Sequence, residues 1–334
     1  MTFTGCGKSH GASSELLMIK LAAHDMEIIM KTKSYWNRRI IIAGMMPAII
    51  AYLVLNIYPS FMTAIYSFTD ISGVQGAGYK FIGLQNYIEF FVLQNYRDSM
   101  DAMKRTLLFA VAVTLIQNFF AILIAVLLNK KRLKGRNFFR AIVFLPSVLG
   151  VTVCCYAWSL FFTMDGPASV ILSRLGGFSS FLGDRAVAFP LVIFIQIWMS
   201  VGYAMVIYIA GLQSIPLELY EAAQIDGAGG IKTFFRITFP LLWPTVTVNV
   251  LLSVIGSLSS VQTILLTTGG ANDTSTLATR IFRAAFGIGS ENLNVTGAGT
   301  LRQGYASALS MILFVIILFV TILTQTYLNR RDKL

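Results

Sequence analysis

Long apolar stretches alternate with polar connections along the chain. A membrane-spanning helix needs about 20 mostly apolar residues, and six stretches reach that length without Asp, Glu, Lys, Arg or His. They are residues 40–68, 106–129, 141–163, 186–212, 241–268 and 304–328. Because lipid offers the backbone no hydrogen-bond partner, such an isolated stretch can cross it only as a helix. The pattern predicts an all-α integral membrane protein with six transmembrane helices.

The composition and the placement of charge agree with this prediction. The chain of 334 residues is 56% hydrophobic and 12% charged, whereas soluble domains carry about 25% charged residues. The formal charge of +11 would suit a nucleic-acid binder if the basic residues formed one surface. Instead they gather beside particular ends of the spans, at Lys31, Lys33, Arg38 and Arg39, at Lys130, Lys131, Arg132, Lys134, Arg136 and Arg140, and at Arg330, Arg331 and Lys333. Membrane topology explains the charge, and we expect no nucleic-acid partner.

The same basic residues predict the orientation of the spans. Lys and Arg concentrate in cytoplasmic connections, and the other connections mix their few basic residues with acids. Six spans with both termini in the cytoplasm satisfy this rule. The loop 129–140 and the polar loop between the fourth and fifth spans then also face the cytoplasm.

Three segments follow from this organisation: a cytoplasmic N-terminal leader at 1–38, a six-span domain at 39–329 and a cytoplasmic basic tail at 330–334. The leader lacks an uninterrupted apolar region and a clear small-residue cleavage site, so we do not expect a cleavable signal. Residues 15–30 suit an amphipathic helix on the membrane surface. An unstructured leader, or a translation start placed too early, explains the segment equally well.

The cysteines and histidines do not predict a metal or catalytic centre. His10 and His24 both precede the first span, and Cys6 lies near the N-terminus. Cys154 and Cys155 are adjacent inside an apolar run and suit small apolar packing. The stretch TGCGKSHG lacks the first glycine and the preceding strand of a phosphate-binding loop. We therefore expect no cofactor, metal or ATPase site in this chain.

The polar loop at 213–240 contains an ordered two-part pattern. Ser214 is a candidate N-cap, and Pro216 fits the first turn of a helix. Glycines at 227, 229 and 230 end that helix and permit a bend. A second short helix is then expected from Ile231 to Ile237, before Pro240 opens the next span. The product is an L-shaped helical element outside the membrane.

At these residues the chain resembles a known family, the permease subunits of ABC importers. Glu221-Ala222-Ala223, three residues, Gly227, nine residues, Ile237, one residue and Phe239-Pro240 match the EAA loop of that family. Phe239 departs from the usual Leu. Further segments resemble the sugar-type subgroup, and most closely the first of its two permease subunits: AGLQSIPLELYEAAQIDGA, FIGLQNY, FFRAIVFLP, TTGG and GYASALSMILF.

The resemblance implies a type I ABC importer transmembrane domain with a cytoplasmic coupling helix. It implies a bacterial cell membrane location and roles for Glu221, Ala222, Ala223, Gly227, Ile237 and Pro240 in ATPase coupling. Glu221 would meet a basic group on the ATPase, the alanines would permit close approach, and Gly227 would make the bend. The implied partners are a second EAA permease subunit, two copies of a cytoplasmic ATPase subunit that uses ATP-Mg, an external solute-binding protein and membrane lipid.

Three classes of function compete on the residues alone. An ABC importer permease fits the loop and the spans. A secondary transporter commonly places ionisable groups within the membrane. The six spans contain none, although carbonyls and hydroxyls can hold sodium. A membrane enzyme would need a nucleophile with a base, or metal ligands, and no such cluster is found in the sequence. We expect a permease for a sugar or oligosaccharide, with ATP hydrolysed by partner subunits.

Polar and aromatic residues inside the spans are candidates for the solute path. Aromatic faces suit the C–H surfaces of sugars, and amides or hydroxyls suit their hydroxyl groups. The candidates are Asn118, Gln196, Trp198, Tyr203, Ser253, Ser257, Ser260, Gln262 and Thr263. For each residue the alternative is a hydrogen bond between packed helices. Trp36 and Trp243 suit the lipid headgroup layer.

The loop from Thr268 to Gln303 is too polar to span and longer than most connections. Residues near 275–286 carry a helix-like apolar pattern and predict a short surface helix at the outer membrane face. The helix would close the path and touch the binding protein, with Arg280 and Arg283 pointing to lipid phosphates or to acidic groups of that protein. The alternative is a helix that merely rests at the membrane interface.

Overall fold

The computed structural model describes residues 38–74, 76–92, 96–130, 134–175, 177, 180–287 and 301–329. The chain divides into two compact units, Met1–Met62 and Thr63–Leu334, which are described separately. Apart from Arg38, the leader, with its proposed surface helix and Trp36, lies outside the described residues, and so does the basic tail at 330–334.

The first unit contains most of the first predicted span. It comprises α2 (Arg38–Tyr52), the π-helical turn η1 (Leu53–Ile57) and the beginning of α3 (Tyr58–Tyr66), which continues into the second unit. Together these elements give one apolar helix over Ile42–Tyr66, close to the predicted 40–68. The π-helical turn lies just before Pro59, whose missing N–H removes one helix hydrogen bond.

Four further spans lie in the second unit. Apolar helices long enough to cross a membrane cover Asp98–Asn129 in α5 (Tyr96–Asn129), Arg185–Gln213 in α9, Gly230–Leu258, and Gln303–Leu328 in α15 (Gln303–Asn329). The described residues thus contain five such helices, or six when one strongly bent pair is counted as a span. The predicted all-helical membrane architecture is confirmed.

The third predicted span, 141–163, is not one helix. It consists of α6 (Arg136–Val148) and α7 (Val151–Phe161), bent by 97° at the break. Leu149 leaves the helical region with φ −69° and ψ 144°, and Pro146 lacks the N–H that would support the last turn of α6. The prediction of a continuous helix is wrong because apolar composition does not reveal a backbone break.

The fifth span also differs from the predicted 241–268. It begins earlier, because α11 (Gly230–Thr233), the π-helical η3 (Phe234–Thr238) and α12 (Phe239–Leu258) run on as one helix over Gly230–Leu258. The separate second helix predicted for Ile231–Ile237 is therefore wrong. The span ends at Leu258, and residues 262–267 form a distinct helix, α13 (Gln262–Thr267).

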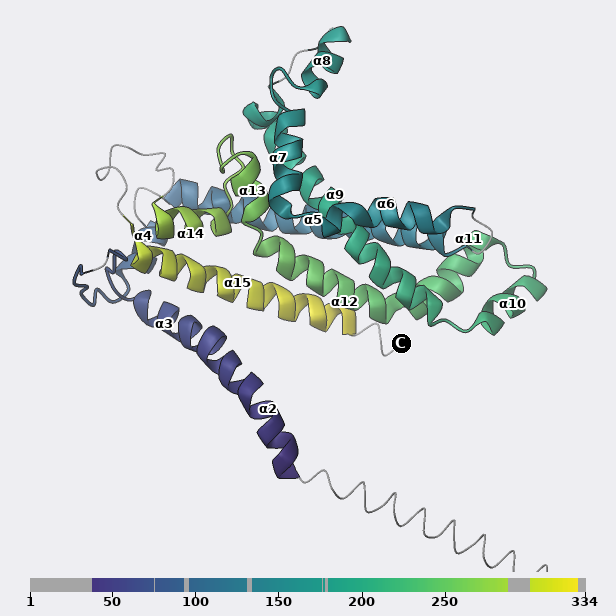
Figure 1. The fold of residues 1–334 in the computed structure, drawn as a ribbon, viewed down its shortest axis with the longest axis horizontal. Coiled ribbons are helices and arrows are strands. Elements are labelled where there is room, and N and C mark those ends of the chain that lie inside the picture. Colours follow the sequence, from purple (N-terminus) through teal and green to yellow (C-terminus); the bar gives the residue numbers. More distant parts are fainter. Residues whose placement is uncertain are drawn as a thin grey trace, which may run out of the picture. The chain divides into compact units, whose positions relative to one another are not determined.

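The core of the second unit lies where α5, α9 and α12 pack together (Figure 1). Small side chains such as Ala121, Ala125 and Ala204 let these helices approach closely. α6 packs on α9, where a Cβ on Gly202 would meet the Val143 carbonyl oxygen at 2.3 Å. α15 packs along α12, and the Trp243 indole N–H donates to the Leu328 carbonyl at 3.3 Å.

Short helices lie in the connections of the second unit. They are α4 (Gln85–Val92), α8 (Pro167–Arg174), η2 (Phe181–Gly183), α10 (Leu217–Ile225) and α14 (Leu277–Phe286). The helix predicted near 275–286 is confirmed as α14, and the Thr276 side chain caps it by accepting from the Thr279 N–H. In Figure 1, α10 and α11 lie at one end of the spanning helices, and α4 and α14 lie at the other.

Candidate functional site: the polar loop and the helices that carry it

The polar loop begins where α9 ends. Ser214 is the C-cap of α9, and its backbone N–H donates to the Ala210 carbonyl at 3.2 Å. The prediction of Ser214 as an N-cap is wrong, because its backbone is still helical and an N-cap is not. The residue preceding α10 is Pro216, with φ −56° and ψ 135°. Glu218 lies in the first turn of α10, where its negative charge interacts favourably with the helix dipole.

Gly227 closes α10 in a left-handed turn, with φ +69°. The Ala228 N–H donates to the Ala223 carbonyl at 2.9 Å, and the Gly227 N–H donates to the Gln224 carbonyl at 3.1 Å. This pattern is a glycine C-cap of the Schellman type. A Cβ at Gly227 would meet nothing within 4 Å, so the backbone conformation alone requires glycine here. The predicted bend at Gly227 is present.

The residues of the EAA pattern face in different directions. Ala223 is buried, and Tyr220 packs against the core formed by α5, α9 and α12. Glu221 and Ala222 are exposed. Further along, Ile237 is half-buried and Pro240 is exposed. The loop is therefore fixed to its own chain on one side, and Glu221 and Ala222 remain available on the other.

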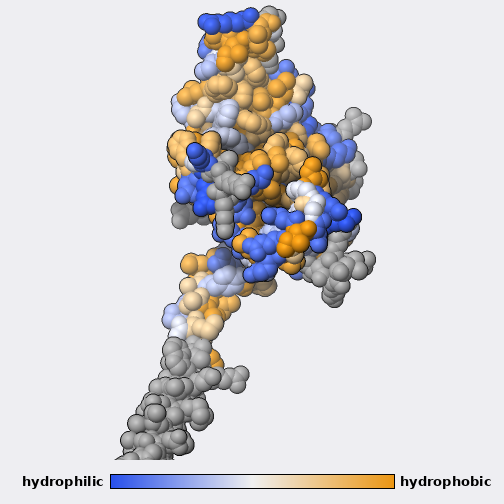
Figure 2. All heavy atoms as spheres, turned by 90° about the vertical axis from the view of Figure 1, so that its right-hand side faces the viewer, coloured by the Kyte–Doolittle hydropathy of each residue, from blue (hydrophilic) through white to orange (hydrophobic). Residues whose placement is uncertain are grey.

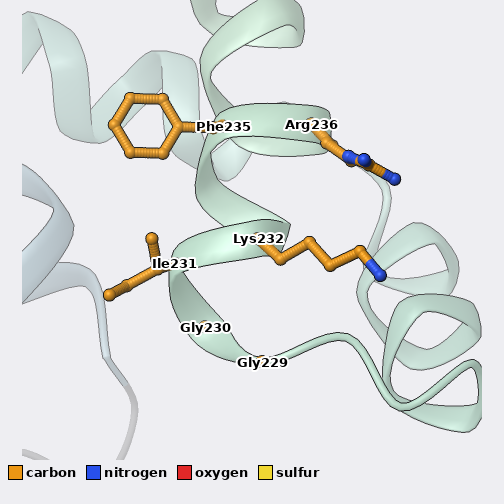
Figure 3. A pocket seen from close by; sticks show the side chains of 6 residues that line it. All are labelled: Gly229, Gly230, Ile231, Lys232, Phe235 and Arg236. Atoms are coloured by element: carbon orange, nitrogen blue, oxygen red, sulfur yellow. The ribbon is translucent and has the colours of Figure 1, made fainter.

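The first turns of the helix that leaves the loop add a second exposed surface. Ile231 and Phe235 point to one side, and Lys232 and Arg236 point to the other (Figure 3). These four residues, with Gly229 and Gly230, line an open cavity of about 490 Å³. Viewed from the end that carries α10 and α11, this face shows hydrophilic side chains mixed with exposed hydrophobic ones (Figure 2). Sequence reasoning missed the apolar pair Ile231 and Phe235, although its four-residue spacing was visible.

Asn118 lies in a buried hydrogen-bond network that joins three helices. Its side-chain oxygen accepts from the Tyr208 hydroxyl at 2.5 Å, and its amide nitrogen lies 3.1 Å from the Ser253 hydroxyl oxygen. The Asn249 amide donates to the Ala204 carbonyl at 3.3 Å, between α12 and α9. In this structure Asn118 joins packed helices, which was the alternative to a place on the solute path.

Gln196 lies at a second polar junction, between α9, α13 and the turn before α13. Its side-chain oxygen accepts from the Ser260 hydroxyl at 3.2 Å and from the Thr263 hydroxyl at 2.6 Å. One turn further along α9, the Ser200 hydroxyl donates to the Gln117 side chain at 3.0 Å. Sequence reasoning missed Gln117 and Ser200, although the four-residue step from Gln196 to Ser200 was a visible signal.

The other path candidates do not join this junction through a side-chain hydrogen bond. Ser257 is buried, and its hydroxyl donates to the Val254 carbonyl of its own helix at 3.0 Å. Trp198 packs edge-on against Trp158, with ring centroids 5.4 Å apart. Tyr203 and Gln262 are exposed. The structure therefore brings together Gln196, Ser260 and Thr263, and leaves Tyr203 and Gln262 on the surface of this chain.

The loop after α13 is held by arginines of the same chain. Gly269, Gly270, Asn272 and Asp273 all have positive φ angles. Arg105 pairs with Asp273 at 2.6 Å. Arg280 donates to the Ser99 hydroxyl at 3.3 Å, and Arg283 donates to the Gly269 carbonyl. Arg280 and Arg283 thus contact their own chain, which corrects the prediction that they point outward, because the folded loop supplies the acceptors.

Among the described residues, no group of three or more His, Cys, Asp or Glu side chains is arranged to hold a metal ion. The candidate site therefore consists of the exposed surface of the polar loop and the hydrogen-bonded polar groups within the spanning helices. It comprises an ordered loop at one end of the spanning helices and hydrogen-bonded groups within them.

The comparisons with known proteins agree on the class of protein. The family model described as binding-protein-dependent transport system inner membrane component matches residues 117–333. The chain is 32% identical to the multiple sugar-binding transport system permease protein MsmF of Streptococcus mutans, over 86% of this chain and 93% of that protein. It is 30% identical to the trehalose/maltose transport system permease protein MalF of Thermococcus litoralis, over 85% and 90% of the two chains.

A solved structure extends the likeness to the fold. A chain of a bacterial ABC transporter involved in the import of the acidic polysaccharide alginate superposes with a TM-score of 0.71 at 25% identity, over 91% of this chain and 99% of that one. The helical membrane fold, the EAA loop and these matches define a permease. The chain belongs to the binding-protein-dependent transport system inner membrane component family, as a sugar-type ABC importer permease of several membrane-spanning helices.

Proposed function

We propose that this chain is one transmembrane subunit of an ATP-driven importer that moves a sugar or oligosaccharide into the cytoplasm. The observation that carries the proposal is the ordered polar loop, with Glu221 and Ala222 exposed and Ala223 anchored in its own core. A loop that merely reversed the chain would need neither a capped helix nor a fixed bend. An ordered, partly exposed loop suits a joint that transmits movement from a partner.

The partner at this loop is an ATPase subunit, and two copies serve the transporter. The chain's own loop would supply the carboxylate of Glu221 to a basic group and the small side chain of Ala222 for close approach. The exposed pair Ile231 and Phe235 extends the same surface with apolar area. The ATPase subunits bind and hydrolyse ATP-Mg, and we assign no nucleotide site to this chain.

A second EAA permease subunit completes the path, and an external solute-binding protein delivers the solute. A second alginate transporter structure is of a complex with an alginate pentasaccharide-bound periplasmic protein. Similar proteins include a probable starch degradation products transport system permease of Thermoanaerobacterium thermosulfurigenes and the trehalose/maltose transport system permease of Thermococcus litoralis. These relatives support a sugar or oligosaccharide as the solute of this chain.

Within this subunit the path passes the polar junction at Gln196, Ser260 and Thr263. These groups already accept and donate hydrogen bonds to one another. A sugar hydroxyl can donate to the Gln196 side-chain oxygen in place of Ser260 or Thr263, and the released protein hydroxyl can then bond to the sugar, so that no polar group is left unsatisfied.

The proposal is tested on the transporter assembled with a sister permease, an ATPase and a binding protein, for which the genes flanking this one are searched first. A panel of mono- and oligosaccharides is first screened for thermal stabilisation of the binding protein, and the stabilising sugar is used for uptake into proteoliposomes. Uptake is expected to require ATP and the binding protein. Uptake driven by a sodium or proton gradient without ATP would overturn the proposal.

Glu221→Lys tests the joint itself. It reverses the charge at an exposed position, so we expect normal membrane insertion, at least tenfold lower uptake and weaker co-purification of the ATPase. Lys104→Glu is the matched control, because it reverses an exposed charge near the start of α5, away from the polar loop, and is expected to have the smaller effect on ATPase binding. Normal ATPase binding and uptake with Glu221→Lys would remove the coupling role from this residue.

A further inference from the structure

Helix α4 has an apolar stripe on its outer side. Leu84, Ile88 and Phe91 are 60%, 49% and 47% exposed. The N–H groups of Tyr87 and Ile88 both donate to the Leu84 carbonyl at 3.0 Å, so Leu84 is the residue from which the helix starts. The spacing of four and then three residues places the three side chains on one face. The three side chains follow the helical repeat, so they form one continuous apolar stripe along α4, and none of them is charged.

The opposite face of α4 is firmly held by the rest of the second unit. Phe90 is fully buried and packs with Leu277, Tyr305 and Leu309 of α14 and α15. Asn86 is also buried, and its side-chain amide donates to the carbonyls of Ser67 and Thr69, both at 2.9 Å. The outer stripe therefore remains exposed although α4 is fully docked.

Two contacts hold α4 beside the ends of two spanning helices. Ser67 and Thr69, which Asn86 binds, follow directly after Tyr66, the last residue of the first spanning helix. Glu89 binds both terminal nitrogens of Arg302 at 2.7 and 2.6 Å, and Arg302 directly precedes the spanning helix Gln303–Leu328. α4 is therefore bound to residues within three positions of the ends of both spanning helices.

The ion pair between Glu89 and Arg302 lies on the inner side of α4. The hydrogen bond from Arg302 to Glu89 is the main cause that raises the pKa of Arg302, and the Arg302 guanidinium also lies 4.6 Å from the centre of the Tyr305 ring. The charged groups of Glu89 and Arg302 therefore bind each other on the inner side of α4. This pairing leaves the outer stripe free of ionised groups.

The turn before α4 extends the apolar surface with aromatic rings. Tyr79 and Phe81 are exposed. Tyr79 contacts Tyr66 edge-on at 6.3 Å, and Phe81 stacks on Phe68 at 6.4 Å between ring centroids. Aromatic side chains are enriched at the membrane–water interface. Between Tyr79 and Phe91 the charged residues are Lys80 and Glu89, and Glu89 is already paired.

We propose that α4 and the aromatic turn before it form an in-plane membrane anchor. The stripe of Leu84, Ile88 and Phe91 inserts into the boundary between acyl chains and headgroups, in the leaflet at the end opposite α10. A contiguous exposed apolar surface marks an interaction site. The stripe lies beside the ends of two spans, is bordered by aromatic rings and contains no charged residue. These features fit a lipid surface, in the manner of interfacial amphipathic helices. The anchor fixes the height of the loop that joins the first two spans.

The test uses the assembled transporter in proteoliposomes of phosphatidylethanolamine and phosphatidylglycerol. Cys6, Cys154 and Cys155 are first replaced by Ala, and a bimane label is attached through Ile88→Cys or, in a second variant, Leu84→Cys. Ala77→Cys is the control, because Ala77 is exposed in the loop before the aromatic turn. Labels are quenched either by phosphatidylcholine carrying a nitroxide on an acyl carbon near the headgroup or by aqueous iodide.

We expect the lipid nitroxide to quench the labels at 84 and 88 at least threefold more strongly than the label at 77, with the reverse order for iodide. Strong iodide quenching and weak lipid quenching at 84 and 88 would mean that the stripe faces water or a transiently docked partner, and would overturn the proposal. Quenching by neither reagent would mean that protein covers the stripe, which also overturns it. The readout does not depend on transport, so it remains decisive if the proposed solute is wrong.

Discussion

Gly227 is required by its backbone conformation and not by contacts with neighbouring side chains. Its φ of +69° is in the left-handed region, and no atom lies within 4 Å of the position that an added Cβ would take. Gly229, two residues later, has equally open space but a φ of −66°. The two glycines therefore differ in backbone conformation and not in steric room.

We predict that Gly227→Ala weakens coupling and that Gly229→Ala does not. A left-handed backbone costs an L-residue about 1–2 kcal/mol, which lowers the population of the bent loop by a factor of roughly 5–30. Uptake by the assembled transporter and co-purification of the ATPase measure the effect, with membrane insertion as the reference. Equal uptake by both variants would show that the bend at Gly227 is dispensable.

The sequence alone could not decide which polar residues join packed helices and which lie on the solute path. Asn118 and Gln196 have similar sequence surroundings, each an amide within an apolar span. In the folded chain Asn118 joins Tyr208 and Ser253, while Gln196 joins Ser260 and Thr263 beyond the end of α12. The partners come from positions 64 to 135 residues away. No local sequence pattern reveals such pairings. The sequence could therefore name candidate residues, but it could not say which of them join helices and which lie on the solute path.

At the scale of the elements, helix packing depends on single glycines. Gly202 on α9 faces α6, where an added Cβ would lie 2.3 Å from the Val143 carbonyl oxygen and 2.8 Å from the Phe144 Cα. Both neighbours are backbone atoms and cannot rotate away. Gly256 on α12 has nothing within 4 Å of an added Cβ.

We predict that Gly202→Ala destabilises the protein, because it forces α6 and α9 apart at a cost of about 1–3 kcal/mol. Gly256→Ala, the matched control, is expected to be neutral or slightly stabilising, since Ala favours a helix over Gly by up to about 1 kcal/mol. Thermal unfolding of the purified protein in detergent measures both. A midpoint for Gly202→Ala equal to that of Gly256→Ala would contradict the close approach of α6 and α9.

The sequence predicts where the spanning helices lie better than it predicts where they break. The spanning helices at Asp98–Asn129, Arg185–Gln213 and Gln303–Leu328 follow from the cost of charge in lipid, which composition records directly. The bend at Leu149 and the end of α12 at Leu258 lie inside apolar runs, where composition changes little. The EAA loop was predictable in kind, but the end of α9 at Ser214 depends on one backbone hydrogen bond.

At the scale of the whole molecule, the orientation in the membrane follows from the distribution of charge. Lys134, Arg136 and Arg140 lie between the end of α5 and the first turns of α6, and Lys232 and Arg236 lie in the polar loop just before α12. At the opposite end arginines pair with acids, as in Arg302 with Glu89 and Arg105 with Asp273. An excess of Lys and Arg favours the cytoplasmic side, so this asymmetry supports the orientation expected from the sequence.

We therefore predict that the loop 129–140 and the polar loop share the cytoplasmic side, and that the loop before α4 lies outside. Single cysteines replace Lys134, Lys232 and Ala77, all of them exposed, in a variant without the native cysteines. A membrane-impermeant maleimide added to intact cells should label Ala77→Cys and leave Lys134→Cys and Lys232→Cys unlabelled. Permeabilisation should then expose the latter two, which controls for access. Labelling of Lys134→Cys and Lys232→Cys in intact cells, with Ala77→Cys protected, would invert the orientation and place the proposed ATPase joint on the wrong side of the membrane.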